Sequence, residues 1–158
     1  MDKPEFMYHA SSELDVQEFE PRNDYPRYKG EENLVFATPY KEVAAMFLVP
    51  KSIPTIISKY GETYAVFING SEEDLSLNDK SGAIYTLPSK TFETNTEIGM
   101  GDTEWVSKQP VKPISKTIYK LSVEALRENH VHLFFLNNDV FARVQADPAN
   151  GLKIVKSS

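Results

Sequence analysis

The stretch Phe6-Met7-Tyr8-His9-Ala10-Ser11-Ser12 decides how this chain is interpreted. Residues 5–9 form a short and largely apolar run, which is typical of a strand near the centre of a sheet. We expect that strand to end at His9, so that a histidine and, two residues later, the hydroxyl of Ser11 stand at a strand end. Taken alone, such a histidine is more often a packed or capping residue than a ligand-binding one.

A second informative stretch, residues 33–48, runs from a strand directly into a helix. The apolar run 34–37 predicts the strand. Thr38 then offers a hydroxyl as N-cap and Pro39 fits the first helical position, so the helix should begin there. Its apolar residues cover one broad face, and the helix should end before Pro50, which has no N–H to continue the hydrogen-bond ladder.

The rest of the chain contains more strands than helices. Expected strands lie at 55–58, 63–68, 83–87 and 91–93, near 104–107, within 111–122 and at 132–136, and short helices at 122–128 and 139–144. Residues 23–33 and 94–103 are expected to be loops, because they contain glycine, proline or charge without periodicity. With 158 residues and no linker or repeat, we predict one domain over 1–158, of the α+β class with mixed or antiparallel sheets.

Composition restricts the possible partners. A net charge of −6 argues against non-specific binding to nucleic acid, which depends on lysine and arginine. The chain has no cysteine, and no apolar run approaches the roughly 20 residues that span a bilayer, so we expect a cytoplasmic protein without a membrane partner. His130 and His132 have a metal-like spacing but no third ligand nearby, so no metal site is predicted.

Three segments in order resemble the ADP-ribosyltransferase family, in the branch of poly(ADP-ribose) polymerases and diphtheria-type toxins. In that branch one strand carries His-Gly-Ser or His-Gly-Thr, the next carries a Tyr-Phe-Ala-like motif that leads into a helix, and a third supplies a glutamate. The matching segments here are Tyr8-His9-Ala10-Ser11, Leu34-Val35-Phe36-Ala37-Thr38 and Glu104-Trp105-Val106-Ser107. The resemblance covers most of the chain and implies an ADP-ribosyltransferase-like fold with split sheets.

The resemblance implies that NAD is the substrate and that ADP-ribose passes to an unknown acceptor, possibly a protein. Glu104 would stabilise the positive charge that develops on the ribose as nicotinamide leaves. His9 would donate a hydrogen bond to a ribose hydroxyl. The backbone of Ala10 would pair with the nicotinamide amide, and Ser11 would add a polar contact.

Four further residues would complete the cofactor pocket by the same resemblance. Val35 and Phe36 belong to the second motif, and either Phe47 or Tyr40 would supply the aromatic wall of the nicotinamide pocket. Val35 stands where the family has tyrosine, which implies transfer of one ADP-ribose rather than polymer growth. A family serine on the helix is also replaced, by Val43 or Ala44. These replacements favour an alternative function, a non-catalytic module of the same fold that binds a nucleotide or a protein.

Other interpretations remain open at this point. Glu93 and Glu97 are alternative carboxylates, and Trp105 suits a core position better than a stacking platform. The loop between the first two motifs holds aromatic and basic residues that suit either a solvated loop or a pyrophosphate contact: Arg22, Tyr25, Arg27, Tyr28 and Lys29. RNA 2′-phosphotransfer uses a similar fold, but the acidic balance argues against it. An unrelated α+β domain would hold His9 and Glu104 far apart.

Overall fold

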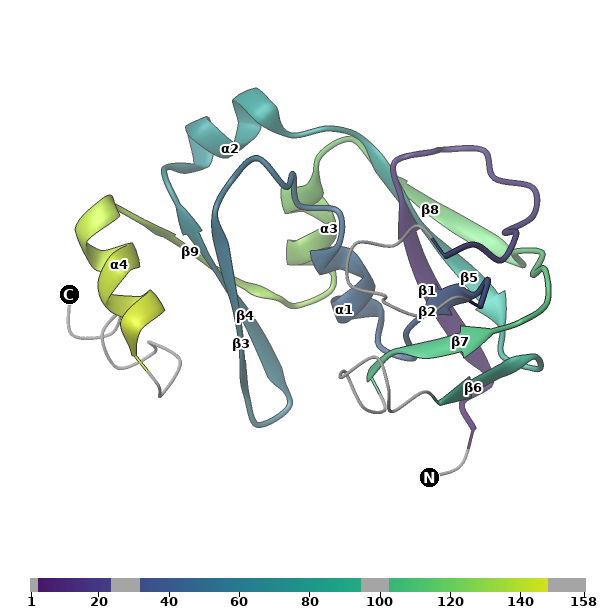
Figure 1. Ribbon diagram of the computed structural model, residues 1–158. Helices are drawn as coiled ribbons and strands as arrows, with labels where there is room; N and C mark the ends of the chain where they lie inside the picture. The colour runs from purple at the N-terminus through teal and green to yellow at the C-terminus, as the bar shows by residue number, and fades with distance from the viewer. Residues whose placement is uncertain (1–2, 24–31, 95–102, 148–158) are drawn as a thin grey trace. The chain divides into compact units, whose positions relative to one another are not determined.

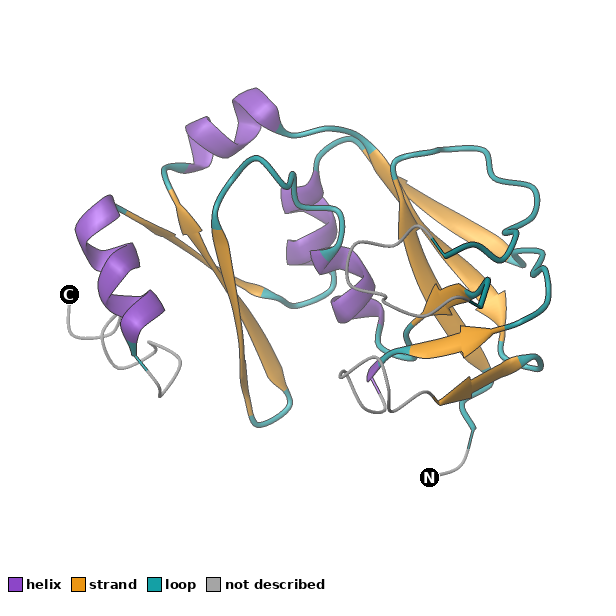
Figure 2. Cartoon of the chain, viewed as in Figure 1, coloured by secondary structure: helices purple, strands orange, loops and turns teal. Residues whose placement is uncertain are grey.

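The chain forms two compact units in the computed structural model, each assembled from two separate stretches of sequence. The described residues are 3–23, 32–94 and 103–147. The first unit comprises 1–48 and 82–119, and the second comprises 49–81 and 120–158. Both units contain helices and strands (Figure 2), which confirms the predicted mixture of the two. A single domain over 1–158 stays a prediction.

The described residues of the first unit form two antiparallel sheets of three strands each. One has the order β1-β5-β8, in which β1 spans Phe6–Ser11, β5 spans Gly82–Pro88 and β8 spans Ser115–Tyr119. The other has the order β2-β7-β6, in which β2 spans Val35–Ala37, β7 spans Trp105–Ser107 and β6 spans Phe92–Thr94. In Figure 1 the first strand, β1, runs beside β5.

Side chains from both sheets form the core of this unit. Met7, Tyr85 and Phe92 are fully buried in it, and Trp105 is 4% exposed, which confirms the prediction that the tryptophan is a core anchor. The short helix α1, Lys41–Met46, packs against β1 and β5. Burial of this apolar area is the main favourable term for holding the two sheets together.

Two sequence predictions about the motif segments are wrong in detail. The first strand continues past His9 to Ser11, because Ala10 and Ser11 still pair with β5. Thr38 does not cap a helix, because its N–H and C=O both pair with Tyr8, at 2.9 and 2.7 Å. Its hydroxyl instead accepts a hydrogen bond from the N–H of Tyr40, and the helix begins only after Tyr40.

In the second unit, residues 49–81 and 120–147 form a mixed sheet and three helices. The strand order is β3-β4-β9, with β3 (Thr55–Tyr60) antiparallel and β9 (His132–Leu136) parallel to β4 (Thr63–Asn69). The helices are α2 (Glu72–Asn78), α3 (Ser122–Glu128) and α4 (Asn138–Ala146). The strands and the last two helices were predicted; α2 was not.

The unpredicted helix α2 has a readable start signal. The Ser71 hydroxyl accepts from the N–H of Asp74, and the Asp74 carboxylate accepts from the N–H of Ser71, which is a capping box. By contrast, α3 is capped from a distant part of the chain. The Asp79 carboxylate accepts from the N–H groups of Ser122 and Val123, at 2.9 and 3.3 Å.

Candidate functional site

The candidate site is built along one edge of β2. At Thr38 the edge pairs with the backbone of Tyr8, and at Leu34 it pairs with the backbone of Arg22. If the antiparallel pairing of β1 and β2 continued from Tyr8 and Thr38, the next pair would be Ala10 and Phe36. The Phe36 carbonyl is instead bonded to Nδ1 of the His9 ring, at 2.6 Å. The histidine ring therefore lies where β1 and β2 separate.

The bond to Phe36 fixes the tautomer of His9. A carbonyl oxygen only accepts, so Nδ1 carries the hydrogen and donates it. Burial lowers the pKa of the ring below its usual 6.5, with a smaller contribution of the same sign from Arg22, while the bond to Phe36 opposes the shift. The ring is therefore neutral at pH 7, and Nε2 is a hydrogen-bond acceptor. This reverses the predicted role of His9, because its remaining nitrogen accepts from a hydroxyl rather than donates to one.

Glu104 is exceptional among the carboxylates of this chain. It is 7% exposed, and it is the one Asp, Glu, Lys or Arg side chain that is buried among the residues the structure describes. Burying a carboxylate is costly unless it is well paired, so such residues are rare outside structural pairs and functional sites. Glu104 is therefore not a solvated strand-edge residue.

Strand register brings Glu104 to the same level as the first motif. The pairing of β2 with β7 ends at Ala37 and Trp105. In the same register, the next two residues, Thr38 and Glu104, lie opposite each other. Thr38 in turn bridges Tyr8, the neighbour of His9. Since adjacent strands lie about 4.8 Å apart, the backbones at Tyr8 and Glu104 are roughly 10 Å apart across β2. The register thus brings the backbones of the first and third segments within two strand spacings of each other.

Four other predicted residues are at least partly accessible in the same unit. Ala10 and Ser11 are half-buried at the end of β1, and the Ser11 hydroxyl accepts from the N–H of Glu13 at 3.1 Å. Tyr40 is half-buried just before α1. Phe47 follows α1 and is 51% exposed, so it does not belong to the core.

The second motif contributes backbone rather than side chains. Val35 is 1% exposed and packs in the core between the sheets, and Phe36 is 5% exposed and packs with Leu34 and Val106. Their proposed contacts with a cofactor would therefore have to come from the main chain, and the Phe36 carbonyl is already used by His9.

Only some of the loop residues that were considered as alternative carboxylates or pyrophosphate contacts lie within the described part of the chain. Glu93 is exposed on β6, whereas Glu97 lies outside the described residues, as do Tyr25, Arg27, Tyr28 and Lys29. Arg22 is described and exposed, and its charge acts on His9. Within the described residues it lies beside the site, because its backbone pairs with Leu34 on the edge of β2.

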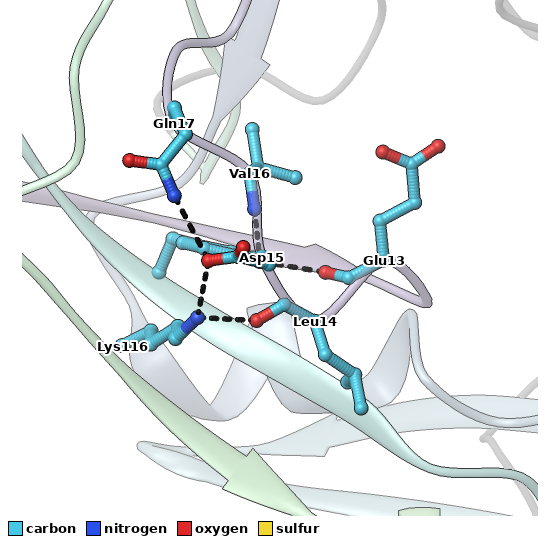
Figure 3. Close-up of polar contacts among 7 residues, drawn as sticks. Glu13, Leu14, Asp15, Val16, Gln17 and Lys116 are labelled. Atoms are coloured by element: carbon cyan, nitrogen blue, oxygen red, sulfur yellow. Dashed lines mark hydrogen bonds and ion pairs between the residues drawn. The ribbon is translucent and has the colours of Figure 1, made fainter.

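Several residues beside His9 were not predicted as functional. The Phe19 ring lies 4.6 Å from the His9 ring, centroid to centroid, and 5.0 Å from the ring of Tyr85. Tyr85 and Lys116 hold the chain segment between Ser11 and Phe19, and Figure 3 shows the contacts of Lys116 with Leu14 and Asp15. These contacts join residues about 70 to 100 positions apart, and nothing local in the sequence signals them.

The described residues also show where metal-binding clusters and membrane-spanning helices are absent. Within residues 3–23, 32–94 and 103–147, no three His, Asp or Glu side chains gather in a way that could hold a metal ion. In the same part of the chain, every helix is too short or too polar to cross a membrane.

Comparison of the chain with protein-family models, with curated proteins and with solved structures found no match.

Proposed function

We propose that the first unit binds NAD in an ADP-ribosyltransferase-like fold and transfers ADP-ribose to an acceptor. The observation that carries the proposal is the buried Glu104, one strand away from the edge of β2 that His9 occupies. The three segments of the resemblance thus belong to neighbouring strands, β1, β2 and β7, instead of being scattered over the unit.

The chemistry of these residues fits cleavage of the bond between nicotinamide and ribose. As nicotinamide leaves, positive charge develops on the ribose, and a carboxylate in a water-poor environment stabilises that charge strongly. Glu104 would supply this stabilisation. The unprotonated Nε2 of His9 would accept a hydrogen bond from a ribose hydroxyl and so orient the sugar.

Three more residues have roles in this proposal. The half-exposed Phe47 would stack on the nicotinamide ring, with Tyr40 as the alternative, and Arg22 would contact the pyrophosphate. The core position of Val35 leaves the pocket without the tyrosine ring of the family, which favours transfer of one ADP-ribose to an acceptor, possibly a protein.

The test is to incubate the full chain with NAD and to follow nicotinamide release. Glu104→Gln keeps the shape of the side chain and removes its charge, so we expect release to fall by about 100-fold or more. Glu93→Gln removes an exposed carboxylate from the neighbouring strand β6 and serves as the matched control, with release unchanged. Equal rates for wild type and Glu104→Gln would refute the catalytic assignment.

A second candidate function is a non-catalytic module that binds a nucleotide or a protein. The replacement of the family tyrosine by the buried Val35 favours it. Saturable binding of NAD by calorimetry without any nicotinamide release would support this function. Absence of both binding and release would exclude NAD as the ligand.

A further inference from the structure

We propose that Phe19 is a positioning residue that fixes the orientation of the His9 ring, and that Tyr85 and Lys116 hold Phe19 in place. The geometry of the unit carries this inference, and its functional consequence rests on the proposed NAD site. The segment from Ser12 to Phe19 would then be part of the site, although it contains none of the motif residues.

Three side chains form a row across one sheet of the first unit. His9 pairs with Tyr85, and Tyr85 pairs with Lys116, so the row takes one residue from each of the strands β1, β5 and β8. Directly paired residues of antiparallel strands point to the same face. The three side chains therefore share one face of the sheet.

This row holds the segment after β1. The Tyr85 hydroxyl donates to the Glu13 carbonyl at 2.6 Å and accepts from the Val16 N–H at 3.0 Å. The Lys116 ammonium donates to the Leu14 carbonyl and forms an ion pair with Asp15 at 3.3 Å (Figure 3). Tyr85 is fully buried, so its two hydrogen bonds are shielded from water.

Phe19 connects the segment to the histidine. The backbone of Phe19 is fixed by two hydrogen bonds to Val111, at 2.8 and 3.0 Å. Its ring is tilted by 54° against His9 and meets Tyr85 edge to face at 81°. Both contacts have the geometry of favourable aromatic pairs. With Phe36 on Nδ1 and Phe19 against the ring, the imidazole has one orientation, in which Nδ1 is used and Nε2 is left for a ligand hydroxyl.

The experiment measures the tautomer of His9 directly, by ¹⁵N NMR of the imidazole in the full chain. Wild type is expected to give the pattern of a neutral ring protonated at Nδ1. Phe19→Ala is expected to give a mixture of the two neutral tautomers, and Phe19→Tyr, which keeps the ring, is expected to restore the wild-type pattern. A purely structural role for Phe19 would not change the tautomer.

Two further variants keep the test decisive if Phe19→Ala does not fold. Phe19→Leu keeps apolar volume without an aromatic ring, and Tyr85→Phe removes the hydroxyl that ties down Glu13 and Val16. Both are expected to mix the tautomers of His9, as Phe19→Ala does. A wild-type pattern in all folded variants would overturn the inference.

A binding measurement separates this inference from the proposed function. If NAD binds, Phe19→Ala should raise Kd or KM by about tenfold with a smaller effect on kcat, because ribose orientation is lost while Glu104 is retained. If NAD does not bind to wild type, the proposed function fails, but the tautomer pattern still decides whether Phe19 positions His9. Unchanged NAD affinity in a variant with mixed tautomers would overturn the functional part of the inference.

Discussion

Removing the His9 side chain tests the core of the site through its effect on stability. In His9→Ala the hydrogen bond from Nδ1 to the Phe36 carbonyl is lost, and removing one partner of a buried hydrogen bond costs about 1–3 kcal/mol. The contact with the Phe19 ring is lost as well, and an aromatic pair contributes about 0.5–1.5 kcal/mol. We therefore expect the free energy of unfolding to fall by about 2–4 kcal/mol at pH 7.5.

The same variant gives a signed prediction about pH. Burial lowers the pKa of His9 in the folded state below the usual 6.5, so below pH 6.5 the unfolded chain takes up a proton that the folded one does not. Wild type therefore loses stability on acidification, by at most about 1.4 kcal/mol per pH unit from this group. His9→Ala has no such titration, so the difference between the two proteins should narrow between pH 7.5 and pH 5.5.

The assay is urea unfolding followed by the fluorescence of Trp105, which is the single tryptophan and lies in the core of the same unit. His132→Ala, an exposed histidine of the second unit, is the matched control and should change stability by less than about 0.5 kcal/mol. A difference between wild type and His9→Ala that widens at low pH would mean that His9 is charged in the folded state. That result would refute both the neutral ring and the acceptor role of Nε2.

Three more predictions test the surroundings of the site and the second unit. Asp79→Ala should lower the stability of the second unit by about 1–2 kcal/mol, because α3 loses its cap; urea unfolding followed by circular dichroism measures this. Asp79→Asn should retain part of that stability. No loss in the alanine variant would contradict the capping assignment. In thermal unfolding, Phe47→Ala should lower stability by less than about 1 kcal/mol, because Phe47 is 51% exposed. Phe92→Ala should lower it by about 3–5 kcal/mol, because Phe92 is fully buried. Equal losses in the two variants would contradict this contrast. Gly82→Ala should cost no more than about 1 kcal/mol, because the added methyl would lie 2.6 Å from Cδ2 of Leu48, the movable end of that side chain. Combining it with Leu48→Ala in a double-mutant cycle should give a favourable coupling, and purely additive effects would contradict that contact.

The strands were the most predictable part of the fold. β-branched and aromatic runs bounded by glycine, such as 63–68 and 83–87, identify their strands within two residues, because local composition and alternation are sufficient signals. Helix starts were less predictable. Thr38 has the composition of an N-cap, but pairing with Tyr8 keeps it in an extended conformation, and a tertiary contact thus overrides a local preference.

The candidate site was only partly predictable. The sequence identified His9 and Glu104 as a pair worth testing, and the strand register brings their segments to opposite edges of β2. It contained no signal for Phe19, Tyr85 or Lys116, whose contacts cross some 70 to 100 residues of chain. Such pairings depend on which strands become neighbours, and periodicity within one segment carries no information about that.

By itself, the sequence determined the class of the fold, the positions of most strands and the set of groups available for chemistry. Only the tertiary structure decided what those groups can do. The neutral state of His9, its accepting nitrogen and the burial of Glu104 all follow from solvent exclusion and from partners on other strands. Solvation and hydrogen bonding set the protonation of a side chain, and both are properties of the folded surroundings rather than of the residue type.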